Sequence, residues 1–238
     1  MKNLSLNRNQ IKYLVIAAML IDHIAWAFVP TESVLGQLMH FIGRLTGPVM
    51  AYFVAEGYFY TGNVKKYALR LGIFALVSWV PFCLFEFQRL PIYQMNGRFH
   101  ILPTFGVIYT LLLSLLAVWL WDKGKCPKWV KILGIIGLCI LSVFGDWPVF
   151  DVLYALVLFC YRDNAKKKWF WFCIISAPVL LLGGFSIWGT FQLGVFMVPV
   201  LMQFFYNGES GSKHPVHKWF FYVFYPLHLL VLGVMQMV

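Results

Sequence analysis

The chain has 238 residues, of which 61% are hydrophobic and only 12% are charged, and its formal net charge at pH 7 is +10. A soluble domain is about 45 to 50% apolar and about 25% charged, so this composition excludes a soluble protein and indicates an integral membrane protein. The basic excess alone would suggest a nucleic-acid partner, but its distribution along the chain, described below, argues against one.

Apolar runs between charged or Pro- and Gly-rich breaks predict about nine helices. Their expected ranges are 11–29, 34–60, 67–86, 101–121, 130–144, 148–161, 169–186, 189–206 and 218–237. The fifth and sixth are short, and one kinked or re-entrant pair around the GDWP sequence at 145–148 is the alternative. We therefore expect an all-α, polytopic transmembrane bundle that forms a single domain over residues 1–238. The first apolar run should be retained as a membrane span, because it contains an acid and a histidine and ends in no small-residue cleavage site.

The positive charges predict the orientation of this bundle. If the N-terminus is cytoplasmic, the cytoplasmic side receives all of the 19 Lys and Arg residues except Arg44, Arg89 and Arg98. This distribution obeys the positive-inside rule, so we expect the N-terminus inside and the C-terminus outside. The same basic loops could attract anionic lipid or meet a phosphate-bearing cytosolic cofactor.

The first helix carries two polar residues inside the apolar stretch MLIDHIAWAF, residues 19–28. An acid at the centre of a membrane helix costs about 2.5 to 3.5 kcal/mol, so Asp22 and His23 are read by default as functional. The neutral imidazole of His23 suits proton transfer, and we predict that it is a general base; a hydrogen-bonded structural role is the alternative. Neighbouring residues point roughly 100° apart on a helix, so we expect Asp22 to pair with Arg44 or with another helix. The carboxylates left as possible partners that orient the His23 ring are Glu56, Asp146 and Asp151.

The second helix carries a basic residue in its outer half, Arg44, and an acidic one near its inner end, Glu56. A buried Arg needs a carboxylate or an anionic substrate group. A structural ion pair with Asp22 or Glu56 and a contact to an anion or oxyanion both fit. We therefore take Asp22, His23, Arg44 and Glu56 as candidate catalytic residues.

Other polar residues are expected mainly at the outer end, where Glu86 closes the third helix and an arginine and a histidine follow in the next loop. The last helix contains a second intramembrane histidine in the sequence YPLH, residues 225–228, for which a structural role beside the proline is the alternative. The candidate substrate-binding residues are Arg70, Glu86, Arg98, His100, Asp146, Asp151 and His228. No metal site is expected, because the sequence HPVH at 214–217 has no carboxylate or Cys beside it at ligand spacing.

These motifs together resemble the TraX family from about residue 13 to the C-terminus. The resemblance is carried by LIDHI, by IGR, by GPVMAYFVAEGYFYTGNVKKYALRLGIFALVSWVPF, by GDW and by FYVFYPLHLLVL. Two positions depart from the family pattern. Gly106 stands where a polar residue such as Asn is expected, and Pro148 replaces the more usual Gly after Trp147.

TraX proteins look like compact relatives of the acyltransferase-3 superfamily, polytopic enzymes that pass an acyl group from cytosolic acyl-CoA to an acceptor. The founding member acts in N-terminal acetylation of conjugative pilin. The resemblance implies a multi-pass protein of the bacterial cytoplasmic membrane, and it maps His23 onto the first-helix histidine of those enzymes. It maps Arg44, Glu56, Arg70 and His228 onto other motif positions.

The expected function is therefore an acyl-CoA-dependent O- or N-acyltransferase. Acetyl-CoA or another acyl-CoA would be the donor, and the acceptor would be an amine or hydroxyl of a peptide, glycan or lipid near the outer face. Two alternatives stay open: a proton-coupled transporter that uses Asp22, His23 and Glu56 as a relay, and a non-catalytic assembly factor for pili or conjugation. Membrane lipids are expected partners, and nucleic acid is not.

Overall fold

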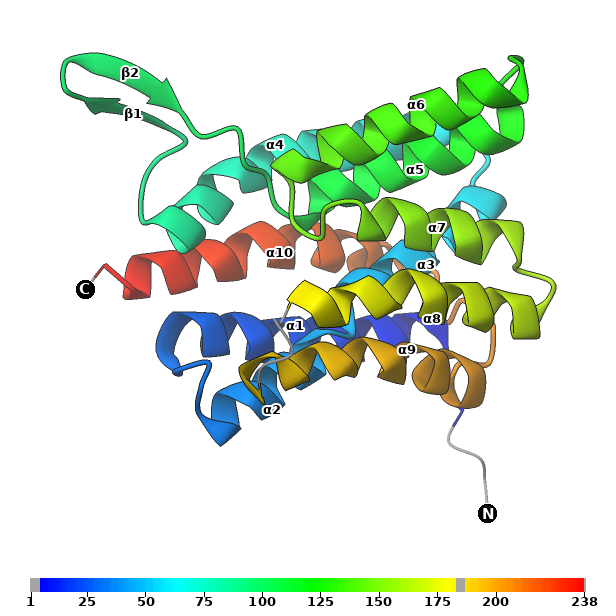
Figure 1. The fold of residues 1–238 in the computed structure, drawn as a ribbon, viewed down its shortest axis with the longest axis horizontal. Coiled ribbons are helices and arrows are strands. Elements are labelled where there is room, and N and C mark those ends of the chain that lie inside the picture. Colours follow the sequence, from blue (N-terminus) through cyan, green and yellow to red (C-terminus); the bar gives the residue numbers. More distant parts are fainter. Residues whose placement is uncertain (1–4, 183–186, 238) are drawn as a thin grey trace.

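The computed structural model describes residues 5–182 and 187–237, and Figure 1 shows a bundle of helices that lie side by side along its long axis. The first helix, α1, begins at the end of the bundle opposite the end where the last helix, α10, finishes. The α-helices are α1 (Arg8–Phe28), α2 (Val34–Gly43), α3 (Thr46–Tyr60), α4 (Val64–Phe87), α5 (Val107–Lys123), α6 (Lys128–Leu141), α7 (Phe150–Cys160), α8 (Ala165–Leu182), α9 (Met197–Val200) and α10 (Pro215–Met235). The predicted helical architecture is confirmed for the described ranges.

Three of the described helices, α1, α4 and α10, are long and apolar enough to cross a membrane. Others are shorter: α7 has 11 residues, or about 16 Å of helix at 1.5 Å per residue, whereas a span needs about 20 residues. The chain thus has membrane-helix character, while the count of nine spans and the placement of the two termini stay predictions.

The predicted helix 34–60 is two helices, α2 and α3, that meet at Arg44 and Leu45. Pro48 explains the break, because a proline has no N–H and its ring would clash with the carbonyl group four residues earlier, that of Arg44. The break turns Arg44 into the C-cap residue of α2. It therefore places that side chain at a corner between two helices instead of along one.

A β-hairpin, formed by β1 (Ile92–Met95) and β2 (Arg98–Ile101), is a departure from the all-α prediction. It ends at Ile101, the first residue of the helix predicted at 101–121, which begins only at Val107 as α5. The hairpin projects beyond the end of α4 in Figure 1. Asn96 and Gly97 form the turn with φ angles of 54° and 73°. An Asn-Gly pair is the usual sequence for a two-residue hairpin turn with both φ angles positive, so the sequence did contain a signal for this element.

The remaining predictions differ mainly at helix boundaries. The predicted helices 130–144 and 148–161 correspond to α6, extended by a 3₁₀ turn at Ser142–Phe144, and to α7. The predicted helix 169–186 corresponds to α8, and its last four residues lie outside the described ranges. The predicted helix 189–206 is a helical stretch made of a 3₁₀ segment (Ile187–Phe196), α9 and a π-helical segment (Leu201–Phe205).

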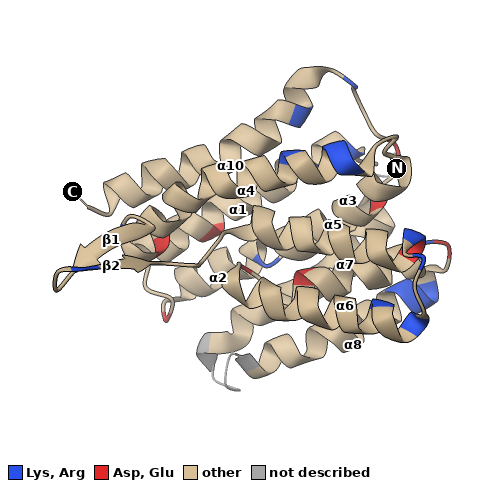
Figure 2. Cartoon of the chain, turned by 90° about the horizontal axis from the view of Figure 1, so that it is seen from above, with Lys and Arg blue, Asp and Glu red and all other residues tan. Residues whose placement is uncertain are grey.

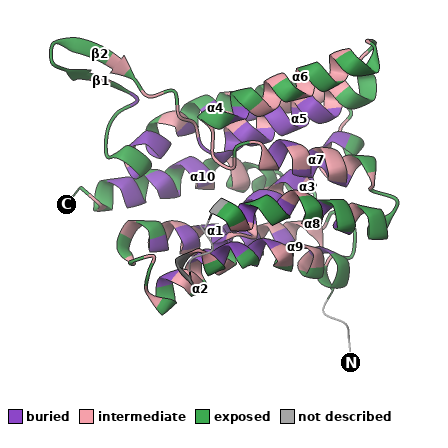
Figure 3. Ribbon diagram, viewed as in Figure 1, coloured by how far each residue is buried: buried purple, intermediate pink, exposed green. Residues whose placement is uncertain are grey.

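The core of the bundle lies around α3, which packs against α1, α5 and α7. Figure 3 shows buried positions along α3 and α5 and exposed ones along α6. None of the described residues of α6 is buried, so this helix lies at the periphery and packs against α5. The largest side chains with under 2% exposure include Ile11, Val15, Val49, Leu115, Val118, Tyr154, Phe172 and Leu229.

Figure 2 shows that most Lys and Arg residues gather at the end of the bundle where α1 begins, with a smaller group at the hairpin. This is the segregation of charge that the sequence predicts. Its consequence for a binding site at that end is described next.

Candidate functional site

A cavity of about 330 Å³ lies between α1, the α2–α3 corner, the end of α4, the start of α5 and the loop before α7. We call it the His23 cavity. Its charged or titratable lining residues are Asp22, His23, Arg44, Glu86 and Asp146. Five of the eleven site residues predicted from sequence therefore line one cavity, and a sixth, His228, contacts His23 from α10.

Asp22 pairs with two groups from the α2 region. Its Oδ1 accepts a hydrogen bond from Nδ1 of His40 at 2.7 Å, and its Oδ2 accepts one from Nη2 of Arg44 at 3.2 Å. The predicted pairing with Arg44 is confirmed, whereas the sequence analysis did not select His40, which is fully buried. Gly43 permits the contact, because a Cβ atom at that position would overlap the carboxyl group of Asp22.

The guanidinium group of Arg44 also lies between two aromatic rings. Its Cζ is 5.0 Å from the ring centroid of Trp147 and 5.2 Å from that of Phe191. Such contacts hold a planar cation in one orientation. Arg44 is thus fixed by Asp22 and by two rings while it lines the cavity.

His23 is oriented by a second histidine from α10. Nδ1 of His23 lies 3.0 Å from Nε2 of His228, and Nδ1 of His228 lies 2.9 Å from the carbonyl oxygen of Phe224. A carbonyl oxygen only accepts, so a neutral His228 ring donates from Nδ1 and accepts at Nε2. His23 then donates from Nδ1, which leaves its Nε2 unprotonated, as a general base requires.

The partner of His23 is therefore not one of the three carboxylates expected from sequence. Glu56 lies at the opposite end of α3, where it accepts hydrogen bonds from Arg8 at 2.9 Å and from the hydroxyl of Tyr206 at 2.7 Å. It does not line the His23 cavity. It ties α1 to the chain before α10, and the catalytic role of Glu56 stays a prediction.

Asp151 is fully buried and does not line the His23 cavity either. Its Oδ2 accepts a hydrogen bond from the Thr110 hydroxyl at 3.1 Å. The substrate-binding role predicted for Asp151 therefore has no route to a ligand in this structure. The physical reason is the direction of α7, which turns this carboxyl group toward α5.

Asp146 does line the His23 cavity, from the loop that precedes α7. Its carboxylate accepts a hydrogen bond from the backbone N–H of Trp147 at 2.9 Å. Burial raises the pKa of the Asp146 carboxyl to about 6. This group therefore acquires its negative charge only as the pH rises through about 6.

Arg98 and His100 lie on β2, and neither lines the His23 cavity. His100 stacks on Tyr93 of the facing strand, with ring centroids 5.4 Å apart. The substrate-binding role of this pair stays a prediction.

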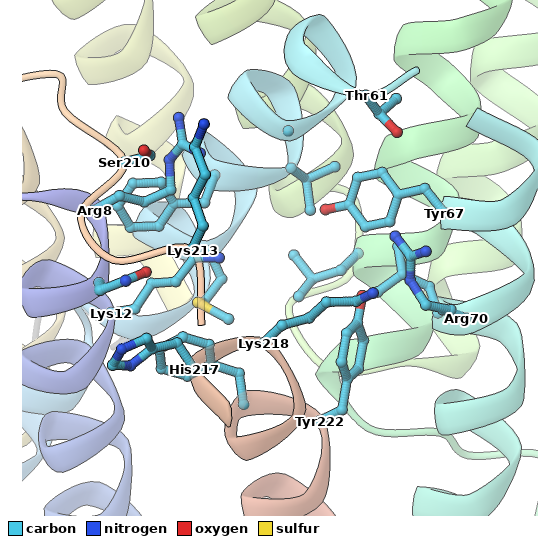
Figure 4. Close-up of a pocket in the computed structure, with 18 of the residues that line it drawn as sticks. Arg8, Lys12, Thr61, Tyr67, Arg70, Ser210, Lys213, His217, Lys218 and Tyr222 are labelled. Atoms are coloured by element: carbon cyan, nitrogen blue, oxygen red, sulfur yellow. The ribbon is translucent and has the colours of Figure 1, made fainter. Parts of the chain in front are cut away.

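A second cavity, of about 350 Å³, lies at the end of the bundle where α1 begins. We call it the basic cavity. Its cationic residues are Arg8, Lys12, Arg70, Lys213 and Lys218, and no Asp or Glu occurs among its described lining residues. Figure 4 shows Arg8, Lys12 and Lys213 on one side and Tyr67, Arg70 and Tyr222 on the other. Arg70, predicted to bind substrate, therefore belongs to this cavity and not to the His23 cavity.

The two cavities lie back to back along the same helices. On α3, Gly47 lines the His23 cavity and Met50 lines the basic cavity, so about 4.5 Å of helix rise separates the two walls. On α5, Val107 lines the first cavity and Ile108 the second. Residues one turn or less apart on α3 and α5 thus line the two cavities.

The comparisons with known proteins agree with the family resemblance. The family described as TraX protein matches residues 7–236. The protein "Probable fimbrial assembly protein FimC, serogroup H1" of Dichelobacter nodosus is 30% identical over an alignment that covers 97% of this chain and 96% of that relative. No solved structure matches the chain. Because the family match extends over nearly the whole chain, the protein belongs to the TraX family.

Proposed function

We propose that this protein is an integral-membrane acyltransferase that moves an acyl group from acyl-CoA to an acceptor amine or hydroxyl. The observation that carries the proposal is the back-to-back arrangement of the basic cavity and the His23 cavity. A donor with phosphate groups suits the first cavity, and a base with an unprotonated Nε2 lines the second. The reacting thioester would lie where the two cavities meet.

The basic cavity supports a donor with several phosphate groups. No carboxylate occurs among the described residues that line this cavity with the five cations. Only Arg8 pairs with an acid, Glu56, which lies outside the lining. Hydrogen bonds between cations and phosphate oxygens are short and strong, and Arg binds them in a bidentate manner. Acyl-CoA is a donor of this chemical class.

The His23 cavity supports an amine acceptor more strongly than a hydroxyl. Three carboxyl groups, those of Asp22, Glu86 and Asp146, line it together with only one arginine. Above about pH 6, where Asp146 is charged, this set attracts an ammonium group. We therefore place the amino end of a peptide first among the acceptors, ahead of a glycan or lipid hydroxyl.

We also propose a role in pilus or fimbria assembly, which is supported by the name of the Dichelobacter nodosus relative.

In the proposed reaction the bound ammonium group first loses one proton to water, so that the neutral amine is the nucleophile. His23 takes the second proton through Nε2 as the acceptor nitrogen attacks the thioester carbonyl carbon. The C–S bond then breaks, and the thiolate leaves and receives the proton. His228 holds the His23 ring in the tautomer that this step requires. Arg44 contributes positive charge close to the developing oxyanion.

The proposed orientation in the bacterial cytoplasmic membrane has nine spans, the N-terminus in the cytoplasm and the C-terminus outside. We expect a single cysteine at Ser210 of a chain whose five native cysteines are replaced to react with a membrane-impermeant maleimide only after permeabilisation. A single cysteine at Asn96, in the hairpin turn, should react in intact spheroplasts. The reverse labelling pattern would overturn this orientation.

The experiment that tests the proposed activity is release of free CoA thiol from acetyl-CoA by the purified protein in nanodiscs, with extracted membranes added as a source of acceptor. Release above the rate of empty nanodiscs supports acyl transfer. No release together with no CoA binding by calorimetry contradicts it. Transport of a solute by proteoliposomes without an acyl donor would favour the transporter alternative.

Replacing Arg70 or Lys218 by Gln should weaken binding of acetyl-CoA, because each change removes a cation from the basic cavity. A charge-assisted hydrogen bond is worth about 1.5 to 3 kcal/mol, so we expect the Kd to rise by about 10- to 100-fold. Isothermal titration calorimetry measures the effect. Lys166→Gln is the matched control, since Lys166 is an exposed lysine at the same end of the bundle outside the basic cavity; an equal loss in all three variants would indicate a non-specific surface effect.

A further inference from the structure

The β-hairpin protrudes from the bundle beside the end of α4, and no described helix packs extensively on it (Figure 1). Residues 88–91 alone separate the last residue of α4 from the first residue of β1. Because α4 is long and apolar enough to cross a membrane, its end and the hairpin that follows lie at the level of the membrane surface. Free strand edges are not found facing lipid within the hydrocarbon core, so this level is the interface between acyl chains and water.

One face of the hairpin is apolar and exposed. The register pairs Ile92 with Ile101 and Gln94 with Phe99, and residues that pair in this way project from the same face of the two strands. Ile92, Phe99 and Ile101 are 53%, 78% and 63% exposed. We call these three side chains the apolar face. A two-stranded hairpin is marginally stable in water, so an apolar face of this kind needs a partner that covers it.

Two arginines accompany the apolar face. Arg89 precedes β1, and Arg98 is the first residue of β2. Neither forms an ion pair with an Asp or Glu in the part of the chain that the structure describes. An open groove of about 520 Å³ follows β1 and is lined by Arg89, Leu90, Ile92, Tyr93, Gln94 and Met95. A cation next to apolar surface, with no acid in the lining, is complementary to a phospholipid, which carries a phosphate next to acyl chains.

From this geometry we propose that the hairpin is a membrane anchor, which binds phospholipids of the leaflet at this end of the bundle. The apolar face enters the boundary of the acyl chains, and the two arginines bind lipid phosphate groups while their stems cover apolar surface. Phe87 and Thr104, which flank the hairpin in sequence, both line the His23 cavity. The anchor therefore holds two parts of that cavity's wall at the membrane surface. This inference does not depend on acyl transfer.

A nitroxide spin label introduced through Phe99→Cys in a chain without its five native cysteines tests the lipid contact. In nanodiscs that contain phosphatidylglycerol, power-saturation electron paramagnetic resonance compares collisions with molecular oxygen, which concentrates in lipid, and with a water-soluble nickel chelate. We expect the label at 99 to favour oxygen, as a label at Leu76 on the exposed side of α4 does, whereas a label at Asn96 in the turn favours the chelate. If the label at 99 behaves as the label at 96 does, the apolar face lies in water and the inference is wrong. If neither reagent reaches it, protein covers this face and the inference is also wrong.

Replacing one arginine tests the phosphate contact. A cation near an anionic lipid surface contributes about fivefold to membrane partition. Arg89→Gln or Arg98→Gln should therefore raise the ratio of water-exposed to lipid-immersed label at 99 by about that factor. Lys125→Gln is the matched control, because Lys125 is an exposed cation in the α5–α6 loop at the opposite end of the bundle, and the ratio should not change. An equal shift in all three variants, or no shift in either arginine variant, would show that these arginines do not bind lipid phosphate.

Discussion

His23→Gln should abolish acyl transfer while leaving CoA binding intact. Glutamine preserves a polar group but has no basic nitrogen, so the acceptor would lose its proton without help. General-base catalysis contributes about 100- to 10,000-fold, and we expect kcat to fall by that amount. The basic cavity does not include His23, so the Kd for acetyl-CoA should not change. Thiol release and calorimetry on the same nanodisc preparation measure the two quantities.

His228→Gln provides a graded comparison for this result. It removes the acceptor nitrogen that holds His23 in one tautomer but leaves the base itself in place. The loss in kcat should therefore be smaller than for His23→Gln. If the wild type and His23→Gln release CoA at the same rate, well above background, then another group is the base. If cells with His23→Gln still assemble pili as the wild type does, the non-catalytic assembly factor is favoured.

The helical bundle could be predicted from sequence because its signal is strong and local. Each helix is a long apolar run with a recognisable break, and the positive charges that gather at one end are visible in the loops. The hairpin was missed because residues 87–100 were taken as an outer loop, and the turn signal at Asn96 and Gly97 was not used. The break at Arg44 was not predicted, since 34–60 was expected as one helix and a proline can bend a helix as well as end it.

The candidate site could be predicted only as a set of residues that share one end of the bundle. Helix direction and depth predicted that Asp22, His23 and Arg44 lie close together. They did not predict that His228, 205 residues away from His23 in sequence, is its partner. Nor did they predict His40, because the side on which a short helix buries its histidine depends on the neighbouring helices. Glu56 lies near the inner end, as the sequence predicts, and there it contacts Arg8 and does not line the His23 cavity.

The buried ion cluster around Asp22 leads to the second large effect, which is on stability. Asp22→Ala leaves Arg44 without its counter-charge and His40 without its hydrogen-bond partner, and the side chains of Arg44 and His40 are only 14% and 0% exposed. Removal of one member of a buried ion pair costs about 3 to 5 kcal/mol, so the free energy of unfolding should fall by that amount. Reversible unfolding of the purified protein in mixed detergent micelles, followed by circular dichroism, measures it.

The control for this prediction is Asp163→Ala, which removes an exposed partner of Arg162 at 3.2 Å. Exposed pairs contribute about 0 to 1 kcal/mol, so the control should unfold almost as the wild type does. If the uncompensated charge of Arg44 causes the loss, then adding Arg44→Leu to Asp22→Ala should recover part of it, because the second change removes that charge. A double variant less stable than Asp22→Ala would instead mean that Arg44 stabilises the α2–α3 corner mainly through its contacts with Trp147 and Phe191.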